Sequence, residues 1–314
     1  LVGLGIDPYR EPRRLLDLPR YAAMERYFDR DGPAGRWMMC ATASVQVCLD
    51  SGYDGENPAA GRRRWALAHA IGPVLVAAFA NSAVARSRPT GWASARQSIW
   101  SRIDPGRTAT VLTGNPTASG DPADPVDAWT RYALDARLLC VRRDGGRPWT
   151  APHGLTLLGW LRGGGDRRPT RSDLDHHLST LFPPVRPRGY LELRMIDAQR
   201  ADGWIVPAAV CATLLEHPVA GDAAMAAVEP LWTAAGRAAT GPAGLWRRAA
   251  RVALGDPALA KAAVSCFDAV IAALPDGRIR TAVEAFAERY PRRGRCPADD
   301  VLAGYLQATT RLIA

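Results

Sequence analysis

The sequence predicts an α+β fold in which an antiparallel sheet packs beside a bundle of helices. Two stretches, 38–50 and 190–197, alternate apolar and polar residues with the two-residue period of a strand. The stretch from Val206 to Ile313 is instead rich in Ala and Leu with helical periodicity. We therefore expect a sheet-containing core over residues 1–205 and a helical C-terminal region over 206–314, packed on that core.

The strand predicted over 190–197 carries two charged side chains. Tyr190, Glu192 and Arg194 share one face, and the apolar residues between them share the other. The carboxylate and the guanidinium are expected about 7 Å apart along the strand. A carboxylate can hold a divalent cation while an arginine grips phosphate or carboxylate oxygens as a fork. An ion pair on the surface of a half-exposed sheet would show the same spacing.

The strand predicted over 38–50 presents a second polar face. Its apolar residues alternate with five others: Thr42, Ser44, Gln46, Cys48 and Asp50. A polar face that stays uncharged until its last residue is typical of a ligand funnel, and also of an antiparallel strand that faces water. The pattern alone leaves both interpretations open.

The other elements follow from periodicity and from Gly or Pro breaks. We expect helices over 20–29, 64–81, 92–103 and 127–135, a short strand over 137–142, and loops over 86–91 and 114–125. The helix over 64–81 is apolar almost all round, which predicts burial. The glycine-rich turn at 163–166 lacks the Lys-Ser/Thr pair of a phosphate-binding loop, so we expect no such loop there. The C-terminal region is interrupted at five Gly or Pro positions, which predicts four to six helices.

The helix predicted over 92–103 places two functional candidates on one face. Arg96 and Trp100 are four residues apart, and Trp92 lies beside them. A surface helix with a cation–π pair would look the same.

Composition narrows the classes of function. The net charge is +9, but almost all basic residues are scattered arginines and Lys261 is the one lysine, so no basic stripe points to nucleic acid. No stretch has the 18 or more apolar residues that a membrane helix needs. Six cysteines without a CxxC pair or zinc spacing favour a reduced, cytoplasmic compartment. The sequence predicts small-molecule ligands and leaves the oligomeric state open.

Three motifs in order resemble glutamate–cysteine ligases of the plant and bacterial type. They are residues 38–50 (MMCATASVQVCLD), 81–100 (NSAVARSRPTGWASARQSIW) and 181–194 (LFPPVRPRGYLELR). The continuation to Gln199, together with 103–108 (IDPGRT), is similar to the actinobacterial branch, which opens ergothioneine biosynthesis. The resemblance is strong over about residues 7–200 and weaker over 284–290 (EAFAERY) and 294–300 (GRCPADD).

The resemblance implies a glutamine-synthetase-like sheet curled into a funnel, and ATP-dependent amide formation with Mg²⁺. The γ-carboxylate of glutamate would be phosphorylated, and the amine of cysteine would then displace phosphate. Carried over by position, the resemblance implies that Glu192 and Gln46 hold metal, with Gln46 also on the nucleotide side. Arg194 would act on the transferring phosphoryl group. It also implies that Arg96, with Thr42, Ser94 and Trp100, binds glutamate.

The sequence departs from the family pattern in two places. Ala41 and Cys48 stand where plant members have Arg and Asn. The family's first strand, whose Gly-x-Glu-x-Glu run supplies metal-binding carboxylates, does not occur, and we expect it ahead of Leu1. Two alternatives remain: a related ligase that joins glutamate to a different amine, and a paralogue that binds glutamate or nucleotide without turnover.

Overall fold

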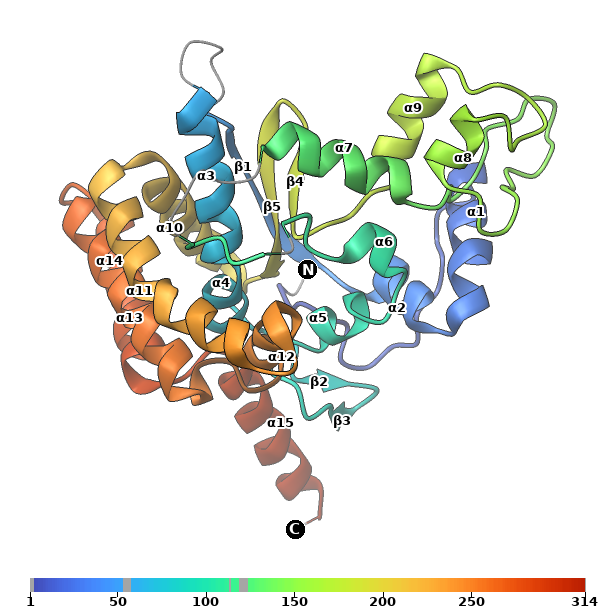
Figure 1. Ribbon diagram of the computed structural model, residues 1–314. Helices are drawn as coiled ribbons and strands as arrows, with labels where there is room; N and C mark the ends of the chain where they lie inside the picture. Colours follow the sequence, from blue (N-terminus) through green and yellow to red (C-terminus); the bar gives the residue numbers. More distant parts are fainter. Residues whose placement is uncertain (1–2, 53–57, 113, 119–123, 314) are drawn as a thin grey trace.

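The computed structural model has the predicted α+β architecture, with a small antiparallel sheet set among helices (Figure 1). It describes residues 3–52, 58–112, 114–118 and 124–313. Leu1 and the middle of the loop predicted over 114–125 lie outside these residues. The remaining description concerns the described ranges.

The sheet consists of three antiparallel strands in the order β1-β5-β4. Their bounds are β1 Ser44–Asp50, β4 Val185–Pro187 and β5 Tyr190–Asp197. Cys48 of β1 and Arg186 of β4 both lie opposite Glu192 of the central strand. A β-bulge interrupts β1 between Val45 and Val47. The register therefore brings polar side chains from all three strands to one face, around Glu192.

The strand predicted over 38–50 is only half correct. Its first residues belong to helix α2 (Ala34–Ala41), and the strand begins at Ser44. The helix buries Gly35, Trp37 and Met38. Met, Ala and Cys at these positions are compatible with a helix, and burial of the apolar side chains outweighs the two-residue alternation.

Two further local predictions are wrong. The segment 137–142 makes only an isolated bridge from Arg137 to Thr156 instead of a strand. The loop predicted over 86–91 contains part of a two-residue hairpin, β2 (Val84–Ala85) with β3 (Arg88–Pro89). The single bridge at Arg137 and the two-residue strands β2 and β3 are too short to show a periodicity in the sequence.

Before the sheet's central strand, helices form near the four predicted ranges, and α6, α8 and α9 form where none was predicted. Their bounds are α1 Pro19–Phe28, α3 Pro58–Ala70, α4 Gly72–Ala78, α5 Ala95–Trp100, α6 Pro105–Thr108, α7 Pro125–Asp135, α8 Leu157–Leu161 and α9 Arg171–Leu178. The helix predicted over 64–81 is divided at Ile71, because Pro73 lacks a backbone N–H. Gly72 also meets the Trp246 ring, which a Cβ would approach to 2.2 Å.

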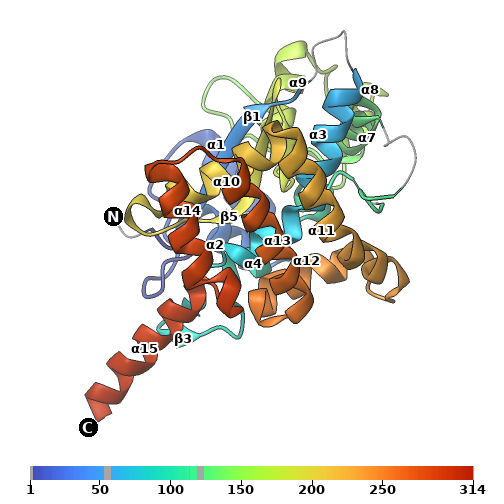
Figure 2. The ribbon, with the colours of Figure 1, turned by 90° about the vertical axis from the view of Figure 1, so that its left-hand side faces the viewer.

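The helical C-terminal region is confirmed, with six α-helices among the described residues. They are α10 Ile205–Glu216, α11 Pro218–Arg237, α12 Gly241–Val252, α13 Pro257–Ala273, α14 Arg278–Arg289 and α15 Pro297–Ile313. Pro218, Pro242 and Pro257 each lie in the first turn of a helix, where a missing N–H costs nothing. Helix α15 extends away from the rest of the chain in both views (Figures 1 and 2).

The main hydrophobic core joins the two predicted regions. It contains apolar side chains of β1 and β5, all of α4, and the inner faces of α10–α14. The prediction of a buried helix is confirmed, since residues 65–84 are buried without a break. The apolar face of the sheet therefore packs on helices of the C-terminal region, while the division at 205/206 stays a prediction.

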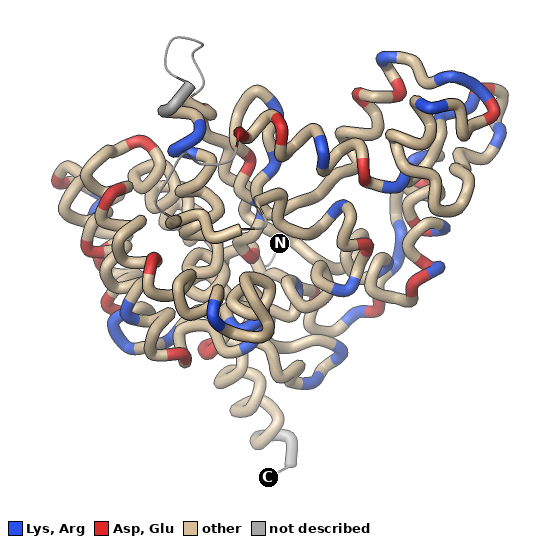
Figure 3. Tube along the Cα trace, in the orientation of Figure 1, with Lys and Arg blue, Asp and Glu red and all other residues tan. Residues whose placement is uncertain are grey.

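Basic and acidic residues are intermingled along the described part of the Cα trace in the view of Figure 3. No single helix in the described ranges is long and apolar enough to cross a bilayer, and one pair bent by 98°, 201–216 with 218–237, meets the criterion only when joined. All six cysteines are free.

A second buried network fixes the helices around α6. Arg107, which is 0% exposed, donates to Asp104, to the carbonyl and hydroxyl oxygens of Thr180, and to the carbonyl oxygen of Arg137. Asp104 also accepts from the hydroxyl of Tyr27 in α1. One guanidinium therefore ties together segments that are far apart in sequence.

We predict that Arg107→Met lowers the free energy of unfolding by about 3–5 kcal/mol, because it leaves a buried carboxylate without its cation. Urea-induced unfolding measures the change. Arg280→Ala is the matched control: Arg280 pairs with Asp276 and Glu284 on the surface of α14, and its loss should cost less than about 1 kcal/mol. Equal losses in the two variants would contradict the assignment.

Candidate active site

The polar face of the sheet centres on Glu192, whose carboxylate is held between two arginines. Arg186 donates through Nε to Oε2 at 2.6 Å, and Arg194 donates through Nη1 to Oε1 at 2.9 Å. Glu192, Arg186 and Arg194 are 5%, 7% and 8% exposed. The alternative of a surface ion pair on a half-exposed sheet is therefore wrong. This buried group of two cations and one anion carries a net positive charge that suits an anionic ligand.

Arg194 has more donors than its partners use. Its Nη1 also donates to Oε1 of Gln46, at 3.2 Å. Its guanidinium carbon lies 5.9 Å from the Trp100 ring centroid and 5.8 Å from that of Phe182. Its Nε is buried without a hydrogen-bond partner. Burial, followed by the charge of Arg186, lowers the pKa of Arg194 to about 10.

The exposed part of the polar face belongs to β1. Gln46, Cys48 and Asp50 are exposed, and Val47 between them is buried, which confirms the predicted alternation within the strand. Burial, followed by the charge of Glu192, raises the pKa of the Cys48 thiol. A thiol with a raised pKa is a poor nucleophile, so we assign no chemistry to Cys48.

Asp197 is a buried carboxylate at the end of β5 that organises the residues around Arg96. Its Oδ2 accepts from Ser82 Oγ at 2.6 Å and from the backbone N–H of Asn81 at 2.9 Å, and its Oδ1 accepts from Ser94 Oγ at 3.0 Å. Arg96 Nη1 lies 3.5 Å from Oδ1. Burial raises the pKa of Asp197, and the charge of Arg96 and these hydrogen bonds oppose the shift.

Arg96 also completes the hydrogen bonding of the central strand. β4 pairs with β5 only as far as Leu193. After that residue, side chains of α5 lie beside β5 in place of a strand. Arg96 donates to the carbonyl oxygens of Arg194 (2.6 Å) and Met195 (3.3 Å), and Gln97 donates to that of Met195 (2.6 Å). These bonds satisfy backbone acceptors that would otherwise be buried without partners. Arg96 is 2% exposed, so the alternative of a surface helix is wrong.

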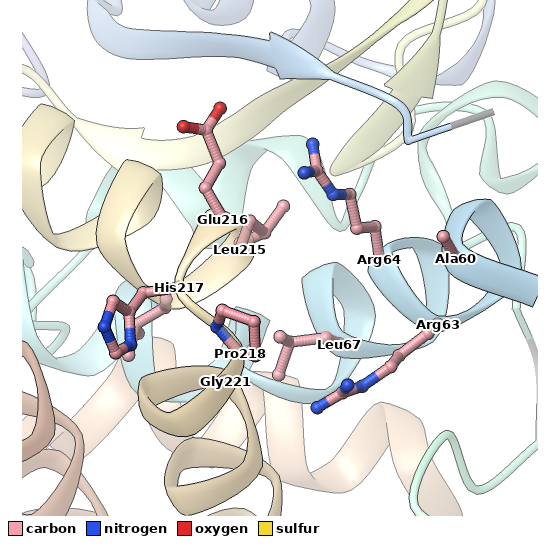
Figure 4. Close-up of a pocket in the computed structure, with 10 residues that line it drawn as sticks. Ala60, Arg63, Arg64, Leu67, Leu215, Glu216, His217, Pro218 and Gly221 are labelled. Carbon is pink, nitrogen blue, oxygen red and sulfur yellow. The ribbon is translucent and has the colours of Figure 1, made fainter. Parts of the chain in front are cut away.

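Three cavities lie among the described residues, and the one of about 500 Å³ lies between α6 and α7, away from the predicted site residues. A cavity of about 20 Å³ lies against Arg96, Arg194, Trp100 and Phe182, and its size suits roughly one water molecule. The third, of about 370 Å³, lies between α3 and the junction of α10 with α11 (Figure 4). Figure 4 shows Arg64 and Glu216 at its rim above an apolar floor that includes Leu67. None of the predicted site residues lines this third cavity.

The structure brings together six of the seven predicted site residues. Glu192 and Gln46 both accept from Arg194. The Trp100 ring lies 5.6 Å from the guanidinium carbon of Arg96. Arg96 and Ser94 both contact Asp197. Thr42 joins none of these contacts in the described part of the chain. It ends α2, and its hydroxyl donates to the carbonyl oxygen of Met38.

Sequence reasoning missed Arg186 and Asp197. Arg186 precedes the strand predicted over 190–197, and the turn at Gly189, with φ of 77°, folds β4 back and places Arg186 opposite Glu192. Asp197 continues the row of Leu191, Leu193 and Met195. A carboxylate at an apolar-face position signals a buried, paired group, and this signal was available from the sequence.

The described residues supply two oxygen ligands for a divalent cation. Oε1 of Glu192 and Oε1 of Gln46 both accept from one atom, Nη1 of Arg194, so they converge on one point. No group of three or more His, Cys, Asp or Glu side chains that could hold a metal ion gathers anywhere in the described ranges, around Glu192 included. Two protein oxygens fit Mg²⁺, which keeps several waters and takes further ligands from substrate phosphates.

Comparisons with known proteins agree with the motifs. The model of the glutamate–cysteine ligase family 2 (GCS2) matches residues 1–310. The chain is 39% identical to the glutamate–cysteine ligase EgtA of Mycolicibacterium smegmatis, over all of this chain and 70% of that protein. It is 39% identical to EgtA of Mycobacterium tuberculosis, over 97% of this chain and 67% of that protein. It is 31% identical to the chloroplastic glutamate–cysteine ligase of Medicago truncatula, over 62% of this chain and 38% of that protein.

The family match spans the sheet, the buried arginines and the C-terminal helices alike. The relatives also match through the region that carries Glu192, Arg194 and Arg96 in this chain. The chain therefore belongs to the glutamate–cysteine ligase family 2.

Proposed function

We propose that the protein joins the γ-carboxylate of glutamate to the amine of cysteine in an ATP-dependent reaction. The product is γ-glutamylcysteine, which supplies ergothioneine biosynthesis. Membership of the glutamate–cysteine ligase family and 39% identity to the two EgtA proteins support this assignment. The single structural observation that carries it is the buried Arg186–Glu192–Arg194 group on the polar face of the sheet.

The charge of this group suits the reaction. Both glutamate and ATP bring negative charge to one place, and a γ-glutamyl phosphate carries it through the reaction. Arginines held in fixed directions bind such oxygens without reorganising when charge develops. Arg194 has a buried Nε without a partner, so it retains a donor for an oxygen of the phosphoryl group or the γ-carboxylate. We assign this role to Arg194.

The glutamate-binding role falls to the residues around α5. Arg96 has its guanidinium at the wall of the small cavity beside Trp100, and Ser94 begins the helix as its N-cap. Arg96 is also engaged with Asp197 and two carbonyl oxygens. We assign Arg96 a glutamate-binding role on the resemblance, and its contacts with Asp197 and the two carbonyl oxygens also support β5. For Thr42 the assignment rests on the resemblance alone.

Glu192 and Gln46 would hold Mg²⁺ on the nucleotide side of the site. A bound Mg²⁺ neutralises phosphate charge during phosphoryl transfer. We further propose that the three strands form part of a glutamine-synthetase-like funnel whose polar face is the ligand side. The free cysteines are compatible with a cytoplasmic enzyme that takes only small-molecule substrates.

The decisive test is release of phosphate or ADP from Mg·ATP and glutamate, with and without cysteine, with the product identified by mass. We expect release that depends on cysteine and a product with the mass of γ-glutamylcysteine. Release only with another amine would leave the mechanism intact and make the protein a sister ligase. If no amine supports release of phosphate or ADP while the protein still binds nucleotide, it is a binding protein without turnover.

We predict that Glu192→Gln abolishes turnover, because it removes the only carboxylate in the described Arg186–Glu192–Arg194 group. The fold should persist, since the apolar face of β5 is untouched. Steady-state kinetics and circular dichroism measure the two effects. Glu216→Gln, on α10 at the rim of the cavity of about 370 Å³, is the matched control and should keep normal turnover. Near-normal activity of Glu192→Gln would remove Glu192 from the site.

We predict that Arg96→Lys raises KM for glutamate more than it lowers kcat, because a point charge replaces a planar fork. A modest loss of thermal stability should accompany it, since lysine cannot reach both carbonyl oxygens and Asp197. Arg102→Lys, on the exposed side just beyond α5, is the control and should leave KM unchanged. An unchanged KM in Arg96→Lys would place Arg96 outside the glutamate site and leave it only its structural role.

A further inference from the structure

Arg194 Nη1 occupies the point at which two candidate metal ligands converge. It lies 2.9 Å from Oε1 of Glu192 and 3.2 Å from Oε1 of Gln46. The two oxygens come from neighbouring strands, β5 and β1, and Gln46 lies at the β-bulge between the paired residues Val45 and Val47. In the structure the cationic nitrogen of Arg194 therefore stands in for a cation bound by both oxygens.

Arg194 is incompletely bonded in this position. Its Nε is buried without a partner, which carries a desolvation cost. The guanidinium of Arg194 lies beside the aromatic rings of Trp100 and Phe182, at cation–π distance from both. A small cavity adjoins the same rings.

We propose that Arg194 and a divalent cation compete for the same two oxygens, and that cation binding releases Arg194 toward the anionic substrate. This inference rests on the proposed function, because the site and its ligands are those of the ligase reaction. Without the cation, Arg194 donates to Oε1 of Glu192 while Arg186 donates to Oε2, so both carboxylate oxygens have a cationic partner. With the cation, Glu192 and Gln46 are occupied and the guanidinium turns its donors to phosphoryl or carboxylate oxygens.

The exchange couples cation and anion binding. Before cation binding, Arg186, Glu192 and Arg194 together carry one positive charge. A divalent cation raises the local charge, and the freed Arg194 becomes a direct ligand for the anion. By linkage, the cation should then strengthen anion binding by the same factor by which the anion strengthens cation binding. Arg194 is thus a positioning residue for the cation site until it becomes a ligand of the substrate.

Mn²⁺ titrated calorimetrically into the nucleotide-free, full-length protein tests the competition. We expect Arg194→Gln to bind Mn²⁺ about tenfold more tightly than the wild type, because a competing charge at hydrogen-bond distance is removed. Arg188→Gln is the charge-matched control: Arg188 is exposed in the turn before β5, and its loss should leave Mn²⁺ affinity unchanged. The difference should persist at high salt, which screens distant charges far more than buried contacts. Equal affinity in wild type and Arg194→Gln would overturn the inference.

A second measurement needs no variant and keeps the inference testable should Arg194→Gln not fold. Glutamate affinity of the wild type is compared with and without Mn²⁺, and we expect about tenfold tighter binding with the cation. Glutamate binding that ignores Mn²⁺ would overturn the coupling.

Glu192→Gln separates the failure of this inference from failure of the metal site. We expect it to lose Mn²⁺ binding. If Mn²⁺ binds the wild type and Arg194→Gln equally and Glu192→Gln not at all, the metal site stands and the competition is wrong. If neither wild type nor Arg194→Gln binds Mn²⁺, both the metal site and the competition are wrong.

Discussion

The buried carboxylate of Asp197 is the constraint on which the site depends. It is 1% exposed, and its burial is tolerated only because Asn81, Ser82, Ser94 and Arg96 surround it with donors. A Cβ on Gly5 would lie 2.5 Å from the Asp197 carboxyl carbon, so only glycine lets the N-terminal segment pass there. One charge thereby holds residues 81–82 and helix α5 at the end of the central strand. Arg194 lies three residues earlier on that strand, and Arg96, which pairs with Asp197, also donates to the carbonyl oxygen of Arg194.

The two faces of β5 carry opposite kinds of interaction. The apolar face packs on α4 and the C-terminal helices and supplies rigidity through close packing. The polar face holds two arginines around one glutamate, an arrangement that leaves unused donors and a net positive charge. A rigid support under an incompletely satisfied charge cluster is what binding and polarising an anion requires, because donors then need little reorganisation during reaction.

Much of this arrangement was predictable from the sequence. The strand 190–197 was predicted because Leu191, Leu193 and Met195 alternate with Glu192 and Arg194, and such alternation is a local property of the chain. The C-terminal helices were predicted because residues 206–313 are rich in Ala and Leu with helical periodicity and are interrupted at Gly and Pro positions. The predictions failed where the local signal was weak or tertiary packing overrode it: residues 38–41 form a helix that buries Trp37 and Met38, and residues 137–142 form no strand.

The sequence by itself determined the fold class and the faces of β5, because these depend on residue type and on periods of a few residues, and the resemblance to the ligase family pointed to six candidate site residues that contact one another. Only the tertiary structure decided what each charge contacts. Arg186 meets Glu192 because a turn at Gly189 folds β4 back, and Gln46 shares Arg194 Nη1 with Glu192 because β1 pairs with β5 across 148 residues of sequence. Contacts of this kind are set by strand register and burial, which no local pattern encodes.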